Sequence, residues 1–197
     1  MRPLVFIIVF FFVSCSNSYE TEEFKAIEDI SNDYLSRNDL SKILNPPSLG
    51  DSAKPKTINI DSLDLKVYFS DALMPISQVK EDDEWMFVDN NFSESDSLIF
   101  YNIANSGKFK ELSYKEFDKT KLKFVRPYRQ YEKFPLKLKE DEEYAILKFS
   151  RVCFDDKKEN GIVVLNYSKG FESGSMSGFQ GALLIKKRDN KWIYILH

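Results

Sequence analysis

Histidine is almost absent from this chain of 197 residues, because its only histidine is His197. A Ser-His-Asp or Cys-His catalytic centre needs an imidazole held by a third group, which is hard to arrange at a chain end that frays. Cysteine is nearly as scarce, since only Cys15 and Cys153 are present, and a structural zinc site has too few ligands. We therefore expect no catalytic residue, no metal and no cofactor, and whether the protein is an enzyme stays open.

An excess of one charge is also missing, because 28 Lys and Arg face 31 Asp and Glu. This balance excludes a uniformly basic nucleic-acid-binding protein. The hydrophobic fraction of 43% and the length fit one ordinary folded domain.

Glycine is scarce as well, and four of the seven glycines, Gly170, Gly174, Gly178 and Gly181, lie close together. Neither the GK[ST] ending nor the strand–GxGxxG–helix context of a phosphate-binding loop accompanies them. We expect a mobile loop with tight turns. The alternative is the lip of a ligand site, with Phe171 and Phe179 as stacking faces.

No apolar run is long enough for a permanent membrane span. Leu4–Val13 is an unbroken apolar stretch of ten residues, whereas a spanning helix needs roughly 20. A basic start, a short apolar run and small residues are typical of a secretory signal. Phe12-Val13-Ser14-Cys15 resembles the lipobox of bacterial lipoproteins, in which cleavage before an acylated cysteine leaves a lipidated N-terminus. The alternatives are an ordinary cleaved signal and an uncleaved apolar start.

The lipoprotein resemblance implies a signal peptide over residues 1–14, a lipid (palmitate-type) anchor on Cys15 and a polar tether over 15–22. Ser16 after the cysteine favours the outer membrane of the cell envelope. Cys153 would then be the one remaining thiol, so no intramolecular disulfide is expected. Its apolar surroundings favour a buried structural thiol.

The remaining chain, residues 23–197, reads as one α+β domain with an internal connector at 45–56. Apolar residues at helical spacing predict an amphipathic helix from Glu23 to Leu35. A second helical turn is expected at 40–44. Four runs with strand composition, 143–154, 161–167, 181–187 and 191–197, are separated by turn signals. The pattern predicts this helix packed on a bent antiparallel sheet that ends in a four-strand meander.

The middle of the chain is less clearly patterned. Further strands are expected at 63–69, 85–88, 97–103 and 121–125, with a helix possible at 114–119.

Two further resemblances concern the C-terminal part. Phe149-Ser150-Arg151-x-x-Phe154, the glycine spacing from Gly174 to Gly181, and Asn190-Lys191-Trp192 resemble uncharacterised Bacteroidetes lipoproteins, which imply no known activity. The closing hairpin is similar to that of NTF2-like domains, which are cone-shaped α+β folds.

Basic residues are concentrated between 108 and 139, where they interleave with aromatic residues. In the envelope, an anionic glycan or an envelope protein is the expected partner, rather than a nucleic acid. We assign the candidate partner-binding role to Arg126, Tyr128, Arg129, Tyr131, Phe171 and Phe179. The alternative is that the basic stretch neutralises the acidic N-terminal half of the same chain.

Two short patterns complete the candidates. Asp51-Ser52-Ala53, Asp61-Ser62-Leu63 and Asp96-Ser97-Leu98 resemble the O-glycosylation acceptor of Bacteroidetes, which implies glycans on Ser52, Ser62 and Ser97. The segment from Asp89 begins like a calcium loop, but it lacks the sixth-position Gly and the twelfth-position Glu. Glu81–Glu84 is expected to be a solvated turn.

These features together favour a lipid-anchored envelope protein that acts as a non-catalytic binding or interaction module. The alternative is an NTF2-like small-ligand-binding or hydrolytic domain with a polar pocket. A filled apolar core would favour the first interpretation, and a cavity lined by converging polar groups would favour the second.

Overall fold

The computed structural model describes residues 3–37, 66–88, 92–125, 129–131, 143–171 and 176–195. Within these ranges it describes the side chains of 18–36, 66–88, 92–125, 144–170 and 178–195. The expected connector at 45–56 and the expected helical turn at 40–44 lie outside these ranges. The calcium-like segment begins outside them, at Asp89.

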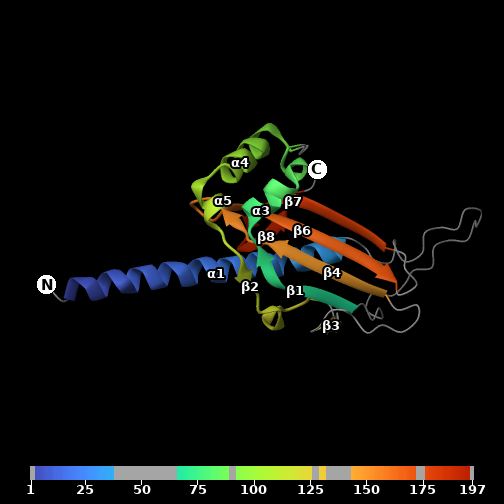
Figure 1. Ribbon diagram of the computed structural model, residues 1–197, viewed down its shortest axis with the longest axis horizontal. Coiled ribbons are helices and arrows are strands. Elements are labelled where there is room, and N and C mark those ends of the chain that lie inside the picture. The colour runs from blue at the N-terminus through green and yellow to red at the C-terminus, as the bar shows by residue number, and fades with distance from the viewer. Residues whose placement is uncertain are drawn as a thin grey trace, which may run out of the picture.

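An eight-stranded sheet forms the centre of the molecule (Figure 1). Its main path runs in the order β2-β1-β4-β6-β7-β8, while β3 pairs with β1 and β5 pairs with β6. The strands are β1 (Lys66–Met74), β2 (Lys115–Glu116), β3 (Arg129–Tyr131), β4 (Glu143–Ser150), β5 (Cys153–Phe154), β6 (Asn160–Phe171), β7 (Met176–Arg188) and β8 (Lys191–Tyr194).

The α+β class and the C-terminal meander are confirmed. Strands β4, β6, β7 and β8 pair antiparallel in sequence order. The sheet as a whole is mixed, however, because β1 runs parallel to both β3 and β4. A parallel pair needs a long crossover connection, and the helical segment between β1 and β4 provides it.

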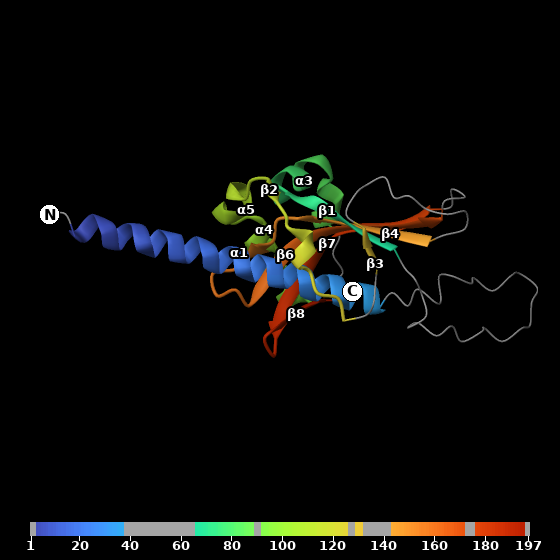
Figure 2. The same cartoon turned by 90° about the horizontal axis from the view of Figure 1, so that it is seen from below.

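Helices cover both faces of the sheet (Figure 2). Helix α1 (Pro3–Arg37) lies on one face, where Ile27, Ile30 and Leu35 are buried against the sheet. The other face carries the four helices between β1 and β2, which we call the helical cap. They are α3 (Ile76–Asp82), the 3-10 helix η2 (Glu84–Phe87), α4 (Glu94–Ala104) and α5 (Gly107–Glu111). A further 3-10 turn, η3 (Lys119–Lys121), follows β2.

Helix α1 begins earlier than the expected start at Glu23. It is continuous from Pro3, so the segment 15–22, expected to be a tether, is helical. No glycine or proline interrupts the chain between Val13 and Glu23, and side chains of this segment contact the sheet from Tyr19 onward. Over the described residues, no helix is both long enough and apolar enough to cross a membrane.

The expected secondary structure of the middle segment is partly wrong. The expected strand at 97–103 belongs to helix α4, and the expected strand at 85–88 is instead the end of η2 and the residue that follows it. Ser93 caps α4 by accepting a hydrogen bond from the Asp96 amide, and acidic residues in the first turn suit the helix dipole. Residues 122–125 form no strand, and the expected helix at 114–119 contains strand β2 instead.

Both predicted hairpin turns are present. Asp189 and Asn190 have positive φ values of 49° and 60°, as a two-residue type I′ turn between β7 and β8 requires. Between β5 and β6, Asp155 accepts hydrogen bonds from the Glu159 amide at 3.0 Å and the Asn160 side chain at 2.7 Å. The predicted strand 143–154 is divided at Arg151 and Val152 into β4 and β5.

Candidate functional site

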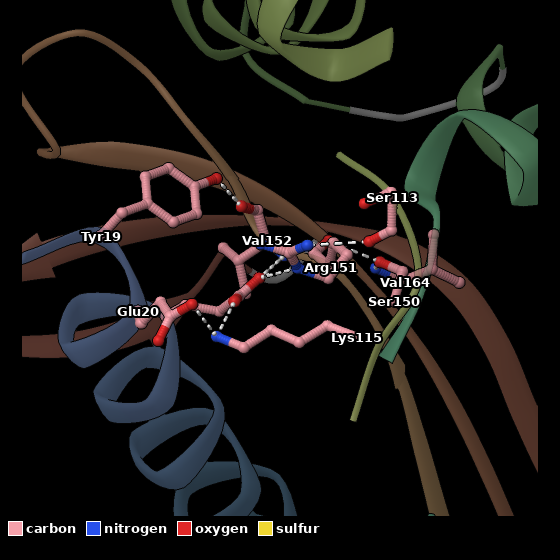
Figure 3. Close-up of polar contacts among 9 residues, drawn as sticks. Tyr19, Glu20, Ser113, Lys115, Ser150, Arg151, Val152 and Val164 are labelled. Carbon is pink, nitrogen blue, oxygen red and sulfur yellow. Dashed lines mark hydrogen bonds and ion pairs between the residues drawn. The ribbon is translucent and has the colours of Figure 1, made fainter. Parts of the chain in front are cut away.

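The most buried carboxylate among the described residues belongs to Glu23 of α1, which is 1% exposed. One of its oxygens accepts hydrogen bonds from Arg151 Nε at 2.7 Å and from the Val152 amide at 3.0 Å (Figure 3). The other oxygen lies 3.3 Å from Lys115 Nζ. Both oxygens are therefore occupied by donors of the protein itself, which is the arrangement of a structural ion pair.

The surroundings of Glu23 are equally well ordered by hydrogen bonds (Figure 3). Arg151 Nη1 donates to the Ser113 carbonyl at 2.8 Å, and the Tyr19 hydroxyl donates to the Val152 carbonyl. Burial, with the negative charge of Glu23 beside it, raises the pKa of Tyr19 well above its usual value. Tyr19 therefore stays protonated as a donor, and this cluster ties α1 to the junction of β4 and β5.

The position of Glu23 in the sequence indicates this cluster, although a glutamate is usually a surface residue. Glu23, Ile27, Ile30 and Tyr34 recur at spacings of four, three and four residues, which place them on one helix face. That face is buried. A carboxylate at its start therefore needed buried donors, but the sequence did not identify Arg151 and Lys115 as those donors.

A second set of polar contacts joins α1 to β7 and to the edge strand β8. Glu22 accepts hydrogen bonds from Lys187 Nζ and from Trp192 Nε1, each at 2.7 Å. Asp29 accepts from the Trp192 amide at 3.0 Å. Burial opposes the ionisation of Glu22, but these two donors outweigh it and hold the pKa of the Glu22 carboxyl below its usual value.

The predicted partner-binding segments meet at one end of the sheet. Arg129 of β3 pairs with Lys66, and Lys66 pairs on its other side with Tyr144 of β4. The preceding residue of β4, Glu143, pairs with Phe171 at the end of β6. The register thus brings Arg129, Tyr131 and Phe171 to the same end of the sheet, near the last residue of β6. We call this the hairpin end. Arg126 and Tyr128 lie outside the described residues, and the side chains of Arg129, Tyr131 and Phe171 are not described.

Phe179 is the one predicted partner-binding residue whose side chain is described. It is 42% exposed, and its ring centroid lies 6.1 Å from that of Tyr34. The ring also covers Gly181, where an added Cβ would come within 2.6 Å of Phe179 Cζ. The expected mobile loop is wrong for Gly170, Gly178 and Gly181, because all three lie in the paired strands β6 and β7. Gly174 lies outside the described residues.

The described part of the basic stretch is largely neutralised within the chain. Lys115 lies 3.4 Å from Glu20 and 3.3 Å from Glu23, and Lys119 lies 2.6 Å from Asp71. These carboxylates belong to the acidic N-terminal half, whereas Lys108 pairs with Asp156 and Lys121 with Asp118. The self-neutralising alternative therefore holds for Lys115 and Lys119 among the described lysines.

The other chemical candidates are placed as follows. Cys153 is a buried free thiol on the cap side of the sheet, and burial raises its pKa to about 11, so it is held as a protonated thiol. Ser97 lies in α4, whereas Ser52, Ser62 and His197 are outside the described residues, as is the side chain of Cys15. In the described ranges, no group of three His, Cys, Asp or Glu side chains is arranged to hold a metal ion.

Several open hollows adjoin these elements. One of about 370 Å³ lies beside Glu20 and Lys115, one of about 410 Å³ lies between η2 and α4, and one of about 520 Å³ lies beside Glu94 and Leu98 of α4. A smaller one, of about 170 Å³, is a polar crevice between α3 and the sheet. There Gln180 donates to Asp83 at 3.2 Å and accepts from Asn166 at 3.3 Å. No local pattern of the sequence indicates this crevice, because its residues come from four separate segments.

Comparisons with known proteins find nothing similar, since no family model, no curated protein and no solved structure matches this chain. The resemblances to lipoproteins and to NTF2-like domains therefore stay predictions.

Proposed function

We propose that this chain is a lipid-anchored cell-envelope protein, attached through Cys15, that acts as a non-catalytic binding module. The observation that carries the proposal is the position and direction of α1, which joins the predicted acylation site directly to the sheet.

The distance between the anchor and the folded body supports the proposal. Tyr19, which stacks edge-on against Phe154 at a centroid distance of 5.4 Å, lies only four residues after Cys15. At about 1.5 Å of rise per helical residue, Cys15 is roughly 6 Å of helix from the first packed side chain. A lipid on Cys15 would hold the domain close to the bilayer through a continuous helix.

The direction of α1 points the hairpin end away from the anchor. Tyr19 contacts the β5 region. Tyr34, near the C-terminal end of α1, contacts Tyr167 of β6 with ring centroids 5.2 Å apart. Helix α1 therefore runs along β6, from near its first residue toward its last (Figure 2). Strand β6 has 12 residues, which at about 3.3 Å per residue span roughly 40 Å. The predicted partner-binding residues would thus face away from the membrane.

An anionic glycan or an envelope protein is the partner that this end fits best. Arg129 and Tyr131 of β3 lie there, paired with Lys66 and Tyr68 of β1, and Lys66 itself is buried. Cationic and aromatic residues together suit anionic polysaccharides or acidic protein surfaces.

The alternative of a small-ligand-binding or hydrolytic domain would use the polar crevice beside Asp83. Its volume of about 170 Å³ is below the roughly 300–1,000 Å³ of typical ligand sites. The hollow of about 370 Å³ beside Glu20 and Lys115 reaches that range, but it is open to solvent and its most buried carboxylate is Glu23. The buried carboxylate Glu23 is also occupied by structural partners. These observations favour the binding module.

The anchor is tested by growing the native bacterial host with a clickable fatty-acid analogue. Cys15→Ala should abolish labelling and release the protein from the membrane fraction, whereas the matched variant Cys153→Ala should label like the wild type. Equal labelling of Cys15→Ala would contradict the proposed anchor.

The binding end is tested by retention of the soluble chain, residues 16–197, on an immobilised sulfated polysaccharide. Arg126→Ala with Arg129→Ala should elute at lower salt than the wild type, with an unchanged melting temperature. Lys121→Ala, which removes an exposed lysine paired with Asp118, is the control and should elute nearly unchanged. A large loss of melting temperature in the double variant would show that the two arginines are structural.

A further inference from the structure

The helical cap leaves large apolar side chains at the surface. Trp85 and Val88, at and just after η2, are 62% and 66% exposed, and Leu98 and Tyr101 of α4 are 61% and 66% exposed. A spacing of three residues puts each pair on one side of its helix. Val88 and Tyr101 line the same hollow of about 410 Å³, and Leu98 lines a second hollow, of about 520 Å³, that also adjoins α4.

The floor of this surface is well packed. Phe87 and Phe100 line the hollow with ring centroids 6.0 Å apart, and Lys80 closes it by donating to the Ala104 carbonyl at 3.4 Å. Lys80 Nζ also lies 5.9 Å from the centre of the Phe87 ring. The exposed residues therefore stand on a fixed base that needs no rearrangement before binding.

Carboxylates lie on the same helices as the apolar residues, and Glu84 and Glu94 line the two hollows beside them. The described residues of the cap from 76 to 104 contain six acidic side chains and one basic side chain. Asp83 accepts from Gln180 and Asp96 is paired with Lys186, so both are engaged within the fold. The other four, Glu81, Asp82, Glu84 and Glu94, are exposed. An apolar surface with an acidic rim repels anionic lipids and attracts a cationic partner.

We propose that the surface formed by Trp85, Val88, Leu98 and Tyr101 docks a basic, amphipathic segment of a partner protein. Apolar side chains of that segment would fill the hollow, with Trp85 and Tyr101 as aromatic anchors. Its Lys or Arg residues would face the four exposed carboxylates. This surface lies on the opposite face of the sheet from α1, and the inference does not depend on lipidation at Cys15.

Fluorescence of Trp85 provides a direct test, because the other tryptophan, Trp192, is fully buried. The soluble chain 16–197 is titrated with a synthetic helical peptide that carries Leu on one face and Lys on the other. We expect a blue shift of the emission, protection of Trp85 from acrylamide, and weaker binding at high salt. The same peptide with Glu in place of Lys should bind at least tenfold more weakly.

Variants locate the binding. Leu98→Ser with Tyr101→Ser should weaken binding of the Lys peptide at least tenfold, and Glu81→Gln with Glu84→Gln and Glu94→Gln should remove most of its salt dependence. Val125→Ser, which removes an apolar residue 82% exposed outside the cap, is the control and should leave affinity unchanged.

Four results would overturn the proposal. The first three are equal binding of the Glu peptide, a Lys-peptide affinity that is unaffected by Leu98→Ser with Tyr101→Ser, and a stronger emission shift with anionic lipid vesicles than with the peptide. A blue shift that grows with protein concentration alone would identify a second copy as the occupant instead, and would also overturn it.

Discussion

The two faces of the sheet are covered in different ways. One long helix, α1, crosses the first face and is joined to it by polar contacts of the buried Glu23 and of the partly buried Glu22 and Asp29. The second face carries the helical cap, whose helices have only 4 to 11 residues. Its buried core is apolar, with Cys153, Val164 and Leu184 beneath it.

This difference indicates that the two faces of the sheet have different roles. Isolated helices of fewer than about 12 residues are marginal in water, so the cap depends on the apolar core beneath it. Helix α1 is fixed by specific donors and acceptors, as an element that positions the domain on an anchor would need to be. The cap instead leaves apolar side chains outside, as a docking surface would. The first face thus suits attachment, and the second suits binding.

The largest expected effect comes from Glu23→Ala on the first face. The substitution leaves the Arg151 guanidinium, whose side chain is 11% exposed, and the Val152 amide without their acceptor. Removing one partner of a buried ion pair typically costs about 3–5 kcal/mol. Urea unfolding of residues 16–197, followed by far-ultraviolet circular dichroism, measures the loss.

Glu20→Ala is the matched control. Glu20 approaches the same Lys115 at 3.4 Å, but its side chain is 58% exposed. An exposed pair of this kind is worth about 0–1 kcal/mol. Equal losses in the two variants would show that α1 is not held by Glu23, and the contrast between the two faces would then fail.

Lys186 and Lys187 of β7 allow the two faces to be compared through neighbouring residues. Lys187 pairs with Glu22 of α1, and Lys186 pairs with Asp96 of the cap. The hydrogen bond from Lys186 is the main cause that lowers the pKa of Asp96, and Glu22 also titrates below its usual value. Replacing either lysine with Met leaves a partly buried carboxylate, at a cost of about 1–3 kcal/mol.

The pH dependence follows from these lowered pKa values. A carboxyl with a lower pKa in the folded than in the unfolded chain stabilises fully at neutral pH, and this contribution is lost as the pH falls below about 4.5. Each Met variant should therefore lose less stability than the wild type between pH 6 and pH 3. Identical slopes in the variants and the wild type would contradict these ion pairs.

The same two variants should differ in local opening. Cys153 lies beneath the cap, with its sulfur 3.8 Å from the Ser106 hydroxyl. Lys186→Met should accelerate labelling of Cys153 by a thiol reagent at pH 8, whereas Lys187→Met should accelerate it less, because it loosens the opposite face.

The sequence predicted the parts of the fold in which local pattern and tertiary packing agree. The Asp189-Asn190 turn and the strand composition of β6 and β7 predict these elements correctly, because turn chemistry and hairpin pairing are local. Helix α4 differs from the predicted strand, because its apolar run 97–103 has strand composition although Ser93 caps it as a helix.

The candidate site was less predictable than the fold. The register that joins β3, β1, β4 and β6 depends on parallel pairing between segments far apart in the chain, which no local pattern reports. The sequence did not indicate the apolar surface of the cap, because it predicts strands around Trp85 and Leu98. A strand of a sheet would bury one of its two faces, so exposed apolar side chains were not expected there.

The smallest expected effects come from two glycines of β7 that lie on opposite faces by strand alternation. At Gly178, an added Cβ would meet the Tyr167 carbonyl oxygen at 2.7 Å, and a paired backbone cannot move away easily. At Gly181, the added atom would meet the ring of Phe179, which is 42% exposed and is able to shift. We expect Gly178→Ala to cost about 1–2 kcal/mol and Gly181→Ala less than about 1 kcal/mol. Thermal unfolding of both variants measures the difference, and a larger loss at Gly181 would show that the contact of Phe179 with Tyr34 fixes the ring. In that case the aromatic packing against α1, rather than the exposed position of Phe179, would decide its role, and its assignment to partner binding would be withdrawn.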